Sequence, residues 1–248
     1  MELSIVIPIY NAGKFIDPAA QKLTKMLSLL GYEYEILFCD DASADESRAI
    51  LERTAGQYPG VQCLYNEKNY GLGFTLRRLF KAAAGRSIVY CDCDLPFGVE
   101  ILPALIGEIQ NHDIVIVSRY LGGRNKIPIL RRLMSRCYYY LCRMLFRISV
   151  KDIGSGTVAF RAGALAELDL KANGFDIHIE WLVQAIRKRL SIREIAASAD
   201  NCSSGSFNIV RHGPRIVWDT IQLRKAKDKT KEEENSGDKK IILISLYL

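Results

Sequence analysis

The chain has 248 residues, of which 49% are hydrophobic and 25% charged, the balance of a globular protein with a sizeable core. Its seven cysteines are odd in number, which excludes a complete disulfide framework and favours reduced thiols. The sequence has no run of about 18 apolar residues, so we predict no transmembrane helix. Its first residues are typical of a strand rather than a signal peptide, and we therefore expect a cytoplasmic protein.

The formal net charge is +6, a modest basic excess. Such an excess favours an anionic partner such as a nucleotide, a lipid phosphate or a membrane surface, although many basic proteins have none. The sequence carries no known nucleic-acid-binding motif, and we predict no nucleic acid partner.

Apolar runs alternate with helical patterns along the first half of the chain. We predict strands at 3–9, 35–39, 87–91 and 113–117, and helices at 14–30, 47–57, 74–84 and 99–110. This alternation predicts an α/β fold, with a mostly parallel, Rossmann-like sheet between two layers of helices. Ligands of such sheets bind at the carboxyl ends of strands, which here are residues 8–11, 40–45, 92–96 and 118–123.

The second half is more helical, with predicted helices at 128–148, 178–190 and 214–225. A glycine-rich turn at Gly154 and Gly156 separates the first two of these helices. Residues 225–240 contain almost no apolar side chain, so we expect 225–248 to be a disordered tail with a short apolar end.

Asp92 and Asp94 directly follow the predicted strand at 87–91. Side chains two residues apart on an extended segment point to the same side, so both carboxylates face one place. Mg²⁺ and Mn²⁺ prefer one or two such carboxylates together with phosphate oxygens. An acid-x-acid pair is weak evidence alone, because a solvated acidic turn has the same pattern.

A second acidic cluster, residues 40–45, follows the predicted strand at 35–39. Capping of the next helix accounts for Asp45. The doubled Asp40 and Asp41 fit capping less well, and one of them could instead bind a nucleobase or ribose edge. Gly71 and Gly73 precede another helix, where they allow a sharp turn or the close approach of a ligand.

Five segments, in this order and spacing, resemble the motifs of family 2 glycosyltransferases, and most of all the dolichyl-phosphate mannosyltransferases and related polyprenyl-phosphate hexosyltransferases. They are Pro8-Ile9-Tyr10-Asn11, residues 40–45, Asn69-Tyr70-Gly71-Leu72-Gly73, Asp92-Cys93-Asp94-Leu95 and Ser118-Arg119-Tyr120. The resemblance covers roughly residues 3 to 200. It implies a GT-A fold, a nucleotide-sugar donor linked to GDP or UDP, a divalent Mg²⁺ or Mn²⁺ ion and inversion at the anomeric carbon.

The resemblance also implies roles for individual residues. Asp92 and Asp94 would hold the metal, and Asp94 and Arg119 would act in catalysis. Arg131 and Ser135 would receive the phosphate of a polyprenyl acceptor. Donor-binding residues would be Pro8, Tyr10, Asn11, Asp41, Gly71, Gly73, Asp92 and Cys93. We expect one domain at 1–224, with a nucleotide-sugar-binding half at 1–123 and an acceptor- and membrane-facing half at 124–224.

Several positions depart from the family pattern. Pro96 stands where a glutamine ligand is usual, and Val158 stands where an arginine is usual. Two alternatives therefore stay open. One is transfer to a saccharide hydroxyl, with Asp176 or Glu180 as the base. The other is a non-catalytic relative that serves as a partner subunit.

The predicted helix at 128–148 is strongly amphipathic. At 100° per residue, one side carries an arginine stripe of Arg132, Arg136, Arg143 and Arg147. The opposite side carries Leu130, Leu133, Met134, Cys137, Leu141, Met144, Leu145 and Ile148. The pattern fits either a helix at an anionic membrane surface or a solvated face over a core stripe. The resemblance favours peripheral contact with a membrane at its inner face, because such enzymes use a lipid acceptor.

Overall fold

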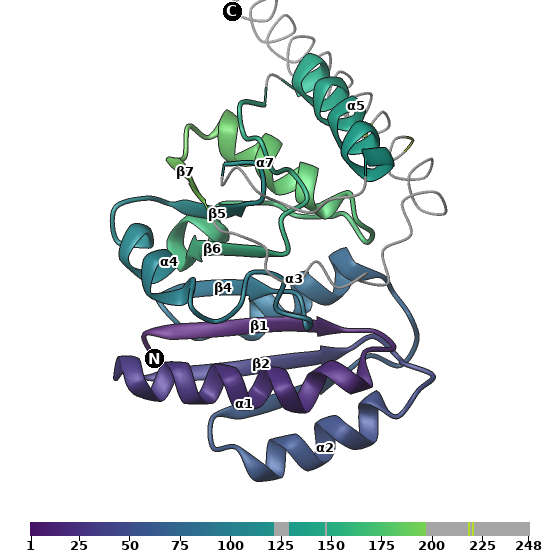
Figure 1. Cartoon of the computed structure of the whole chain (residues 1–248), viewed down its shortest axis with the longest axis vertical. Coiled ribbons are helices and arrows are strands. Elements are labelled where there is room, and N and C mark those ends of the chain that lie inside the picture. The colour runs from purple at the N-terminus through teal and green to yellow at the C-terminus, as the bar shows by residue number, and fades with distance from the viewer. Residues whose placement is uncertain (122–128, 147, 197–217, 219, 221–248) are drawn as a thin grey trace, which may run out of the picture.

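Seven strands form one sheet in the order β3-β2-β1-β4-β6-β5-β7 (Figure 1). The structure, a computed structural model, describes residues 1–121, 129–146 (backbone only for 129–135), 148–196, 218 and 220. All strand pairs are parallel except those of β6, which runs antiparallel to both β4 and β5. The strands are β1 (Leu3–Ile9), β2 (Tyr34–Asp40), β3 (Val61–Tyr65), β4 (Ser87–Cys91), β5 (Ile114–Ser118), β6 (Thr157–Arg161) and β7 (Ile192–Ala196).

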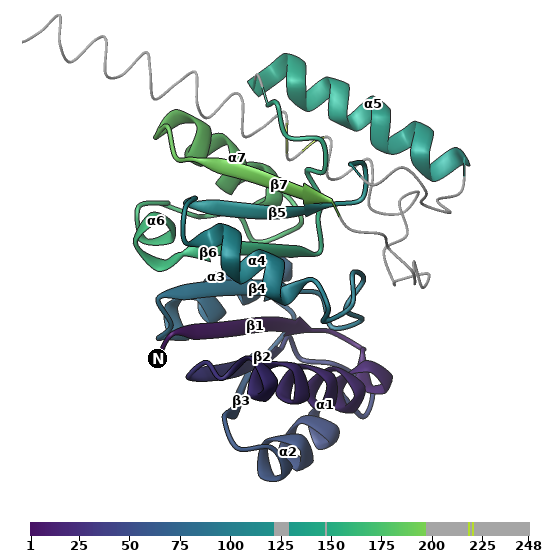
Figure 2. The ribbon, with the colours of Figure 1, turned by 60° about the vertical axis from the view of Figure 1, so that its left-hand side comes forward.

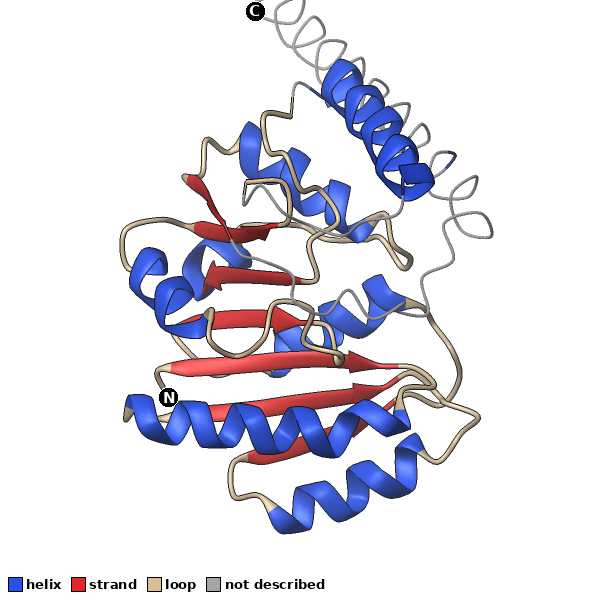
Figure 3. Cartoon of the chain, viewed as in Figure 1, coloured by secondary structure: helices blue, strands red, loops and turns tan. Residues whose placement is uncertain are grey.

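Helices cover both faces of this sheet (Figures 2 and 3). Side chains of α1, α2 and α4 pack in one core cluster, and side chains of α3, α5, α6 and α7 pack in a second. The helices are α1 (Gly13–Leu30), α2 (Ser47–Gln57), α3 (Leu72–Ala82), α4 (Leu102–Ile109), α5 (Ile129–Phe146), α6 (Ala162–Ala166) and α7 (Ile177–Arg187). The mostly parallel α/β fold predicted from the sequence is confirmed.

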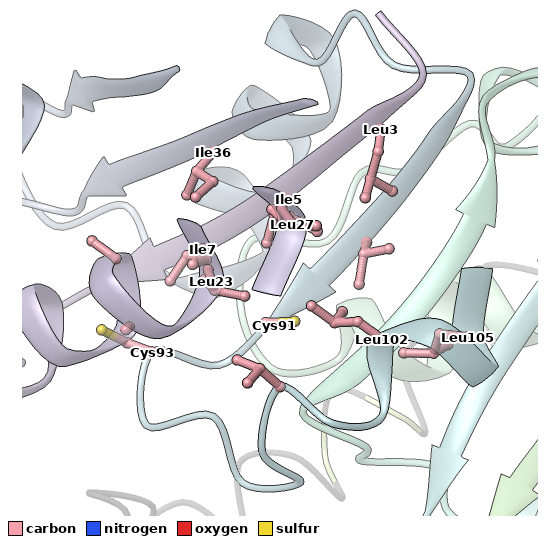
Figure 4. Close-up of a cluster of buried hydrophobic side chains, with 14 of the residues drawn as sticks. Leu3, Ile5, Ile7, Leu23, Leu27, Ile36, Cys91, Cys93, Leu102 and Leu105 are labelled. Atoms are coloured by element: carbon pink, nitrogen blue, oxygen red, sulfur yellow. The ribbon is translucent and has the colours of Figure 1, made fainter. Parts of the chain in front are cut away.

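Residue alternation in β1 explains why two cores form. Ile5 and Ile7 point into the first cluster, where they meet Leu23 and Leu27 of α1 (Figure 4), whereas Val6 lies in the second. Each of these side chains is fully buried. Such burial contributes about 1.5–3 kcal/mol per residue, so both faces of the central strands stabilise the sheet.

The predicted elements of the first half are confirmed within a few residues, but three strands and one helix were not predicted. These are β3, β6, β7 and the short α6. The predicted helix at 214–225 and the tail at 225–248 lie outside the described residues, apart from Trp218 and Thr220. Within the described part of the chain, no helix is both long and apolar enough to cross a membrane.

The reversed direction of β6 has a direct consequence for the loops around it. Thr157, the first residue of β6, pairs with Cys91, the last residue of β4. The loop before β6, residues 150–156, therefore enters the sheet at the edge where β4 and β5 end.

Candidate active site

The loops after β1, β2, β4 and β5 meet the loop before β6 at the carboxyl edge of the sheet. Hydrogen bonds join the β1 loop to the β2 loop, the β4 loop to the β6 loop, and the β5 loop to the β6 loop. The predicted strand-end motifs therefore lie together at this edge. They form two groups, one in the loops after β1 and β2 and the other in the loops after β4 and β5.

Asn11 connects the loops that follow β1 and β2. Its backbone N–H donates to Ser43 Oγ at 2.8 Å, and its Oδ1 accepts the Ala44 N–H at 2.8 Å. Asn11 adopts a positive φ of 50°, a conformation that asparagine tolerates better than most residues. Beside it, Tyr10 is 50% exposed, so its ring is open to a ligand. The N-cap residue of α2 is Glu46 rather than Asp45, but Asp45 accepts the Ser47 N–H at 3.0 Å and the Gly13 N–H at 3.2 Å.

The Asp41 carboxylate organises the loop between β3 and α3. Its Oδ1 accepts Asn66 Nδ2 at 2.7 Å and the Tyr70 N–H at 2.9 Å, and its Oδ2 accepts the Gly71 N–H at 2.8 Å. A carboxylate offers about four acceptor sites, so these bonds fill most of the capacity of Asp41, which is only 4% exposed. Its contact with a nucleoside stays a prediction.

Gly71 and Gly73 are approached by another part of the chain. A Cβ on Gly73 would overlap the carbonyl of Ala172, and one on Gly71 would overlap the carbonyl of Asn173. The Gly73 N–H donates to Asn173 O at 2.8 Å. The two glycines therefore admit the backbone of residues 172–174, a role that the sequence did not indicate.

Glu180 of α7 holds this approaching segment in place. Its buried carboxyl accepts the backbone N–H groups of Lys171 and Ala172 at 2.9–3.0 Å. Arg77 of α3 donates to Ala172 O at 3.2 Å from the other side. Glu180 is thus committed to the loop, which weakens its candidacy as a general base.

Asp92 is fixed on three sides. The Tyr90 hydroxyl donates to its Oδ1, its backbone N–H donates to Gly156 O at 2.8 Å, and a Cβ on Gly156 would overlap its Oδ2. Burial raises the pKa of Asp92 to about 6, and the negative charge of Asp94 acts in the same direction. The Cys93 side chain is 7% exposed and packs in the first core cluster (Figure 4), so a contact with the donor would have to come from its backbone.

Arg119 forms a bidentate pair with Asp152, a residue that the sequence analysis did not single out. Nε and Nη2 of Arg119 each lie 2.9 Å from a carboxylate oxygen of Asp152, and Nη2 also donates to Gly154 O at 2.7 Å. This pairing raises the pKa of Arg119 although burial opposes it. Nothing in the sequence around Asp152, which directly follows Lys151, marks it as a partner of Arg119.

The side chains at this place could coordinate a divalent cation whose remaining coordination positions are filled by a bound molecule. Asp92 and Asp94 supply two carboxylates, and among the described residues no group of three or more His, Cys, Asp or Glu side chains could hold a metal. Mg²⁺ is commonly bound by one or two carboxylates with water and phosphate oxygens at the remaining positions. The side chains of Arg131 and Ser135, the predicted acceptor-phosphate residues, lie outside the described part of the structure.

A mostly parallel sheet with an acid-x-acid pair at its carboxyl edge is the arrangement of GT-A glycosyltransferases. Residues 4–169 match the family model described as glycosyl transferase family 2. The chain therefore belongs to glycosyl transferase family 2.

Two curated relatives carry related names. The chain is 33% identical to a dolichol-phosphate mannosyltransferase of Pyrococcus furiosus, over 74% of this chain and 53% of that protein. It is 25% identical to an undecaprenyl-phosphate mannosyltransferase of Micrococcus luteus, over 90% of this chain and 99% of that protein. The chain thus spans about half the length of the Pyrococcus relative.

Solved structures share the fold at low identity. Glucosyl-3-phosphoglycerate synthase of Mycobacterium tuberculosis, in complex with UDP, superposes with a TM-score of 0.69 at 19% identity, over 90% of this chain and 79% of that chain. The same enzyme has been solved with Mn²⁺, UDP and glucosyl-3-phosphoglycerate, with a TM-score of 0.68. These similarities establish the GT-A fold.

We predict that Asp152→Asn destabilises the protein by about 3 kcal/mol, because it leaves the largely buried Arg119 charge without its partner. Urea unfolding measures the change. Glu52→Gln is the matched control, since the Arg48–Glu52 pair is exposed and its loss should cost less than about 0.5 kcal/mol. Equal losses in the two variants would contradict the structural importance of the Arg119–Asp152 pair.

His178 of α7 predicts a pH-dependent stability. Its ring lies 5.8 Å from that of Tyr90, its Nδ1 has no hydrogen-bond partner among the described residues, and burial lowers its pKa to about 4. An unfolded histidine titrates near ~6.5, so the unfolded state binds a proton first as the pH falls. The contribution of neutral His178 is complete above pH ~6.5 and is lost as the pH falls towards 4.

At about 1.4 kcal/mol per pH unit, wild type should lose about 2 kcal/mol between pH 7.5 and pH 5 relative to His178→Asn. Urea unfolding of both proteins at each pH gives this difference. The raised pKa of Asp92 contributes with the opposite sign, but it is common to both proteins and cancels. An unchanged difference between the two pH values would contradict a buried, neutral His178.

Proposed function

We propose that this protein transfers a hexose from a GDP- or UDP-linked sugar to a polyprenyl phosphate, with inversion at the anomeric carbon. The observation that carries the proposal is the grouping of Asp92, Asp94 and Arg119 at the carboxyl edge of the sheet. The names of the Pyrococcus and Micrococcus relatives support the class of acceptor.

Asp92 and Asp94 would hold Mg²⁺ or Mn²⁺ together with the donor diphosphate. The cation, when bound, would neutralise charge on the leaving nucleoside diphosphate. Arg119 would contact the donor phosphates with its guanidinium plane held by Asp152, so its orientation is set before the donor arrives. Exposed Tyr10, with Pro8 and Asp41 beside it, would bind the nucleoside.

A phosphate acceptor fits the few candidate bases among the described residues of the site. The second pKa of a phosphate monoester is near ~6, so the acceptor oxygen is largely ionised at neutral pH and needs no strong general base. Transfer to a sugar hydroxyl would need a base, and Asp176 at the start of α7 is then the candidate, because Glu180 is committed to residues 171–172.

The exposed side chains of α5 support the proposal that this helix contacts the cytoplasmic surface of a membrane. Arg136, Cys137, Tyr140, Arg143 and Met144 are all exposed and fall within one sector of the helix. Met144 is 75% exposed and Tyr140 63%, so large side chains stand beside the exposed arginines and not only on the opposite side of the helix. A mixed cationic and apolar face is typical of helices that lie at anionic lipid surfaces.

We predict that the protein, incubated with Mn²⁺ or Mg²⁺, a panel of nucleotide sugars and a polyprenyl phosphate, produces a glycosylated lipid detectable by mass spectrometry. Asp94→Asn should abolish the product, because it removes one of the two carboxylates available to the cation. Glu52→Gln, far from the site, is the matched control and should keep the wild-type rate.

Other outcomes of this assay separate the alternatives. Product only with saccharide acceptors, lost in Asp176→Asn and kept in Arg131→Ala, would favour a hydroxyl acceptor. No product with any donor or acceptor would sink the proposed reaction and favour a non-catalytic relative.

Binding to phosphatidylserine-containing vesicles should depend on the arginines of α5. Each basic residue near an anionic surface contributes about 1 kcal/mol, so R136Q with R143Q should weaken partitioning about 30-fold in a flotation assay. R48Q with R53Q removes two exposed arginines from α2 and is the matched control. Equal effects of the two double variants would argue against α5 as the contact surface.

A further inference from the structure

The hydroxyl of Tyr90 is a polar group placed in an apolar core directly behind Asp92. Tyr90 and Asp92 are two positions apart at the end of β4, so both side chains project from the same face of the sheet. Tyr90 is 2% exposed and lies in the second core cluster, with the His178 ring 5.8 Å from its own. Its hydroxyl donates to Asp92 Oδ1.

This hydrogen bond is costly to lose. A phenol is protonated at neutral pH, so the Tyr90 hydroxyl is the donor and the Asp92 carboxylate the acceptor. A buried hydroxyl without its acceptor would be left unsatisfied, and a charge-assisted bond is stronger than a neutral one. The Tyr90 hydroxyl therefore holds the Asp92 carboxylate from the side of the core and restricts its rotation.

Gly156 restricts the other oxygen of the same carboxylate. Asp92 Oδ2 occupies the space that a Cβ on Gly156 would fill, and the Gly156 carbonyl accepts the Asp92 N–H. One oxygen is thus fixed by a hydrogen bond and the other by close packing. Together these contacts select a single orientation of the carboxylate.

We propose that Tyr90 is a positioning residue that holds Asp92 in the orientation in which Asp92 and Asp94 take up a divalent cation with a nucleoside diphosphate. The inference rests on the proposed function, because it assumes that this carboxylate pair binds the cation. Because Tyr90 is only 2% exposed, it would act through Asp92 rather than on the cation or the donor. Residues that orient metal ligands in this way typically change metal affinity by about 10–100-fold when they are replaced.

Tyr90→Phe tests the proposal, because it removes the hydroxyl and keeps the ring. Mn²⁺ binding in the presence of UDP or GDP, measured from the electron paramagnetic resonance signal of free Mn²⁺, should be at least about tenfold weaker than in wild type. Tyr34→Phe is the matched control. Tyr34 is the first residue of β2, at the end of the strand away from the candidate site, and its hydroxyl lies 3.4 Å from Ser28 Oγ. It should bind Mn²⁺ as wild type does.

A second variant reaches the same carboxylate from the other side. Gly156→Ala should displace Asp92 Oδ2 and weaken Mn²⁺ binding while Tyr90 is intact, which protects the test against a folding defect of Tyr90→Phe. Wild-type Mn²⁺ affinity in a folded Tyr90→Phe protein would overturn the inference and leave the proposed function standing. Failure of wild type to bind Mn²⁺ with either nucleotide would overturn both.

Discussion

The antiparallel placement of β6 between β4 and β5 is the constraint on which the candidate site depends. A parallel strand in this position would begin at the opposite edge of the sheet. Because β6 runs the other way, residues 150–156 arrive beside the ends of β4 and β5. This single loop supplies Gly156, which contacts Asp92, and Asp152, which pairs with Arg119. It therefore fixes the residue that directly follows each of the two neighbouring strands.

Electrostatic interactions among Asp92, Asp94 and Arg119 link the fold to the proposed chemistry. The negative charge of Asp94 raises the pKa of Asp92, the positive charge of Arg119 lowers it, and Asp152 pairs with Arg119. The raised pKa of Asp92 reflects the cost of keeping a further negative charge in a largely buried place. A cation bound as in the proposed function would relieve this cost.

The sequence was sufficient for the features that depend on local pattern. Apolar runs and helical periodicity located β1, β2, β4, β5 and the main helices, and the strand-end rule directed attention to Asp41, Asp92 and Arg119. The partners of those residues could not be predicted, because they come from distant segments. Asp152 is an ordinary acidic residue in the sequence, and Glu180 was considered only as a base. The course of the chain brings Asp152 to Arg119 and Glu180 to residues 171–172. Tyr90 likewise looked like a core residue, since its hydroxyl contact depends on the turn taken after β4.

The docking of residues 172–174 onto Gly71 and Gly73 has a consequence for how the chain reaches its native state. The hydrogen bond between Arg77 and Asn173 joins positions 96 residues apart. During synthesis the strands β1 to β4 emerge first, yet the loop between β3 and α3 lacks its covering segment until residue 173 has appeared. Closing so long a loop costs chain entropy before its contacts form, so we expect this contact to form late in folding. The loop between β3 and α3 is therefore completed by a segment that is synthesised well after the strands beside it.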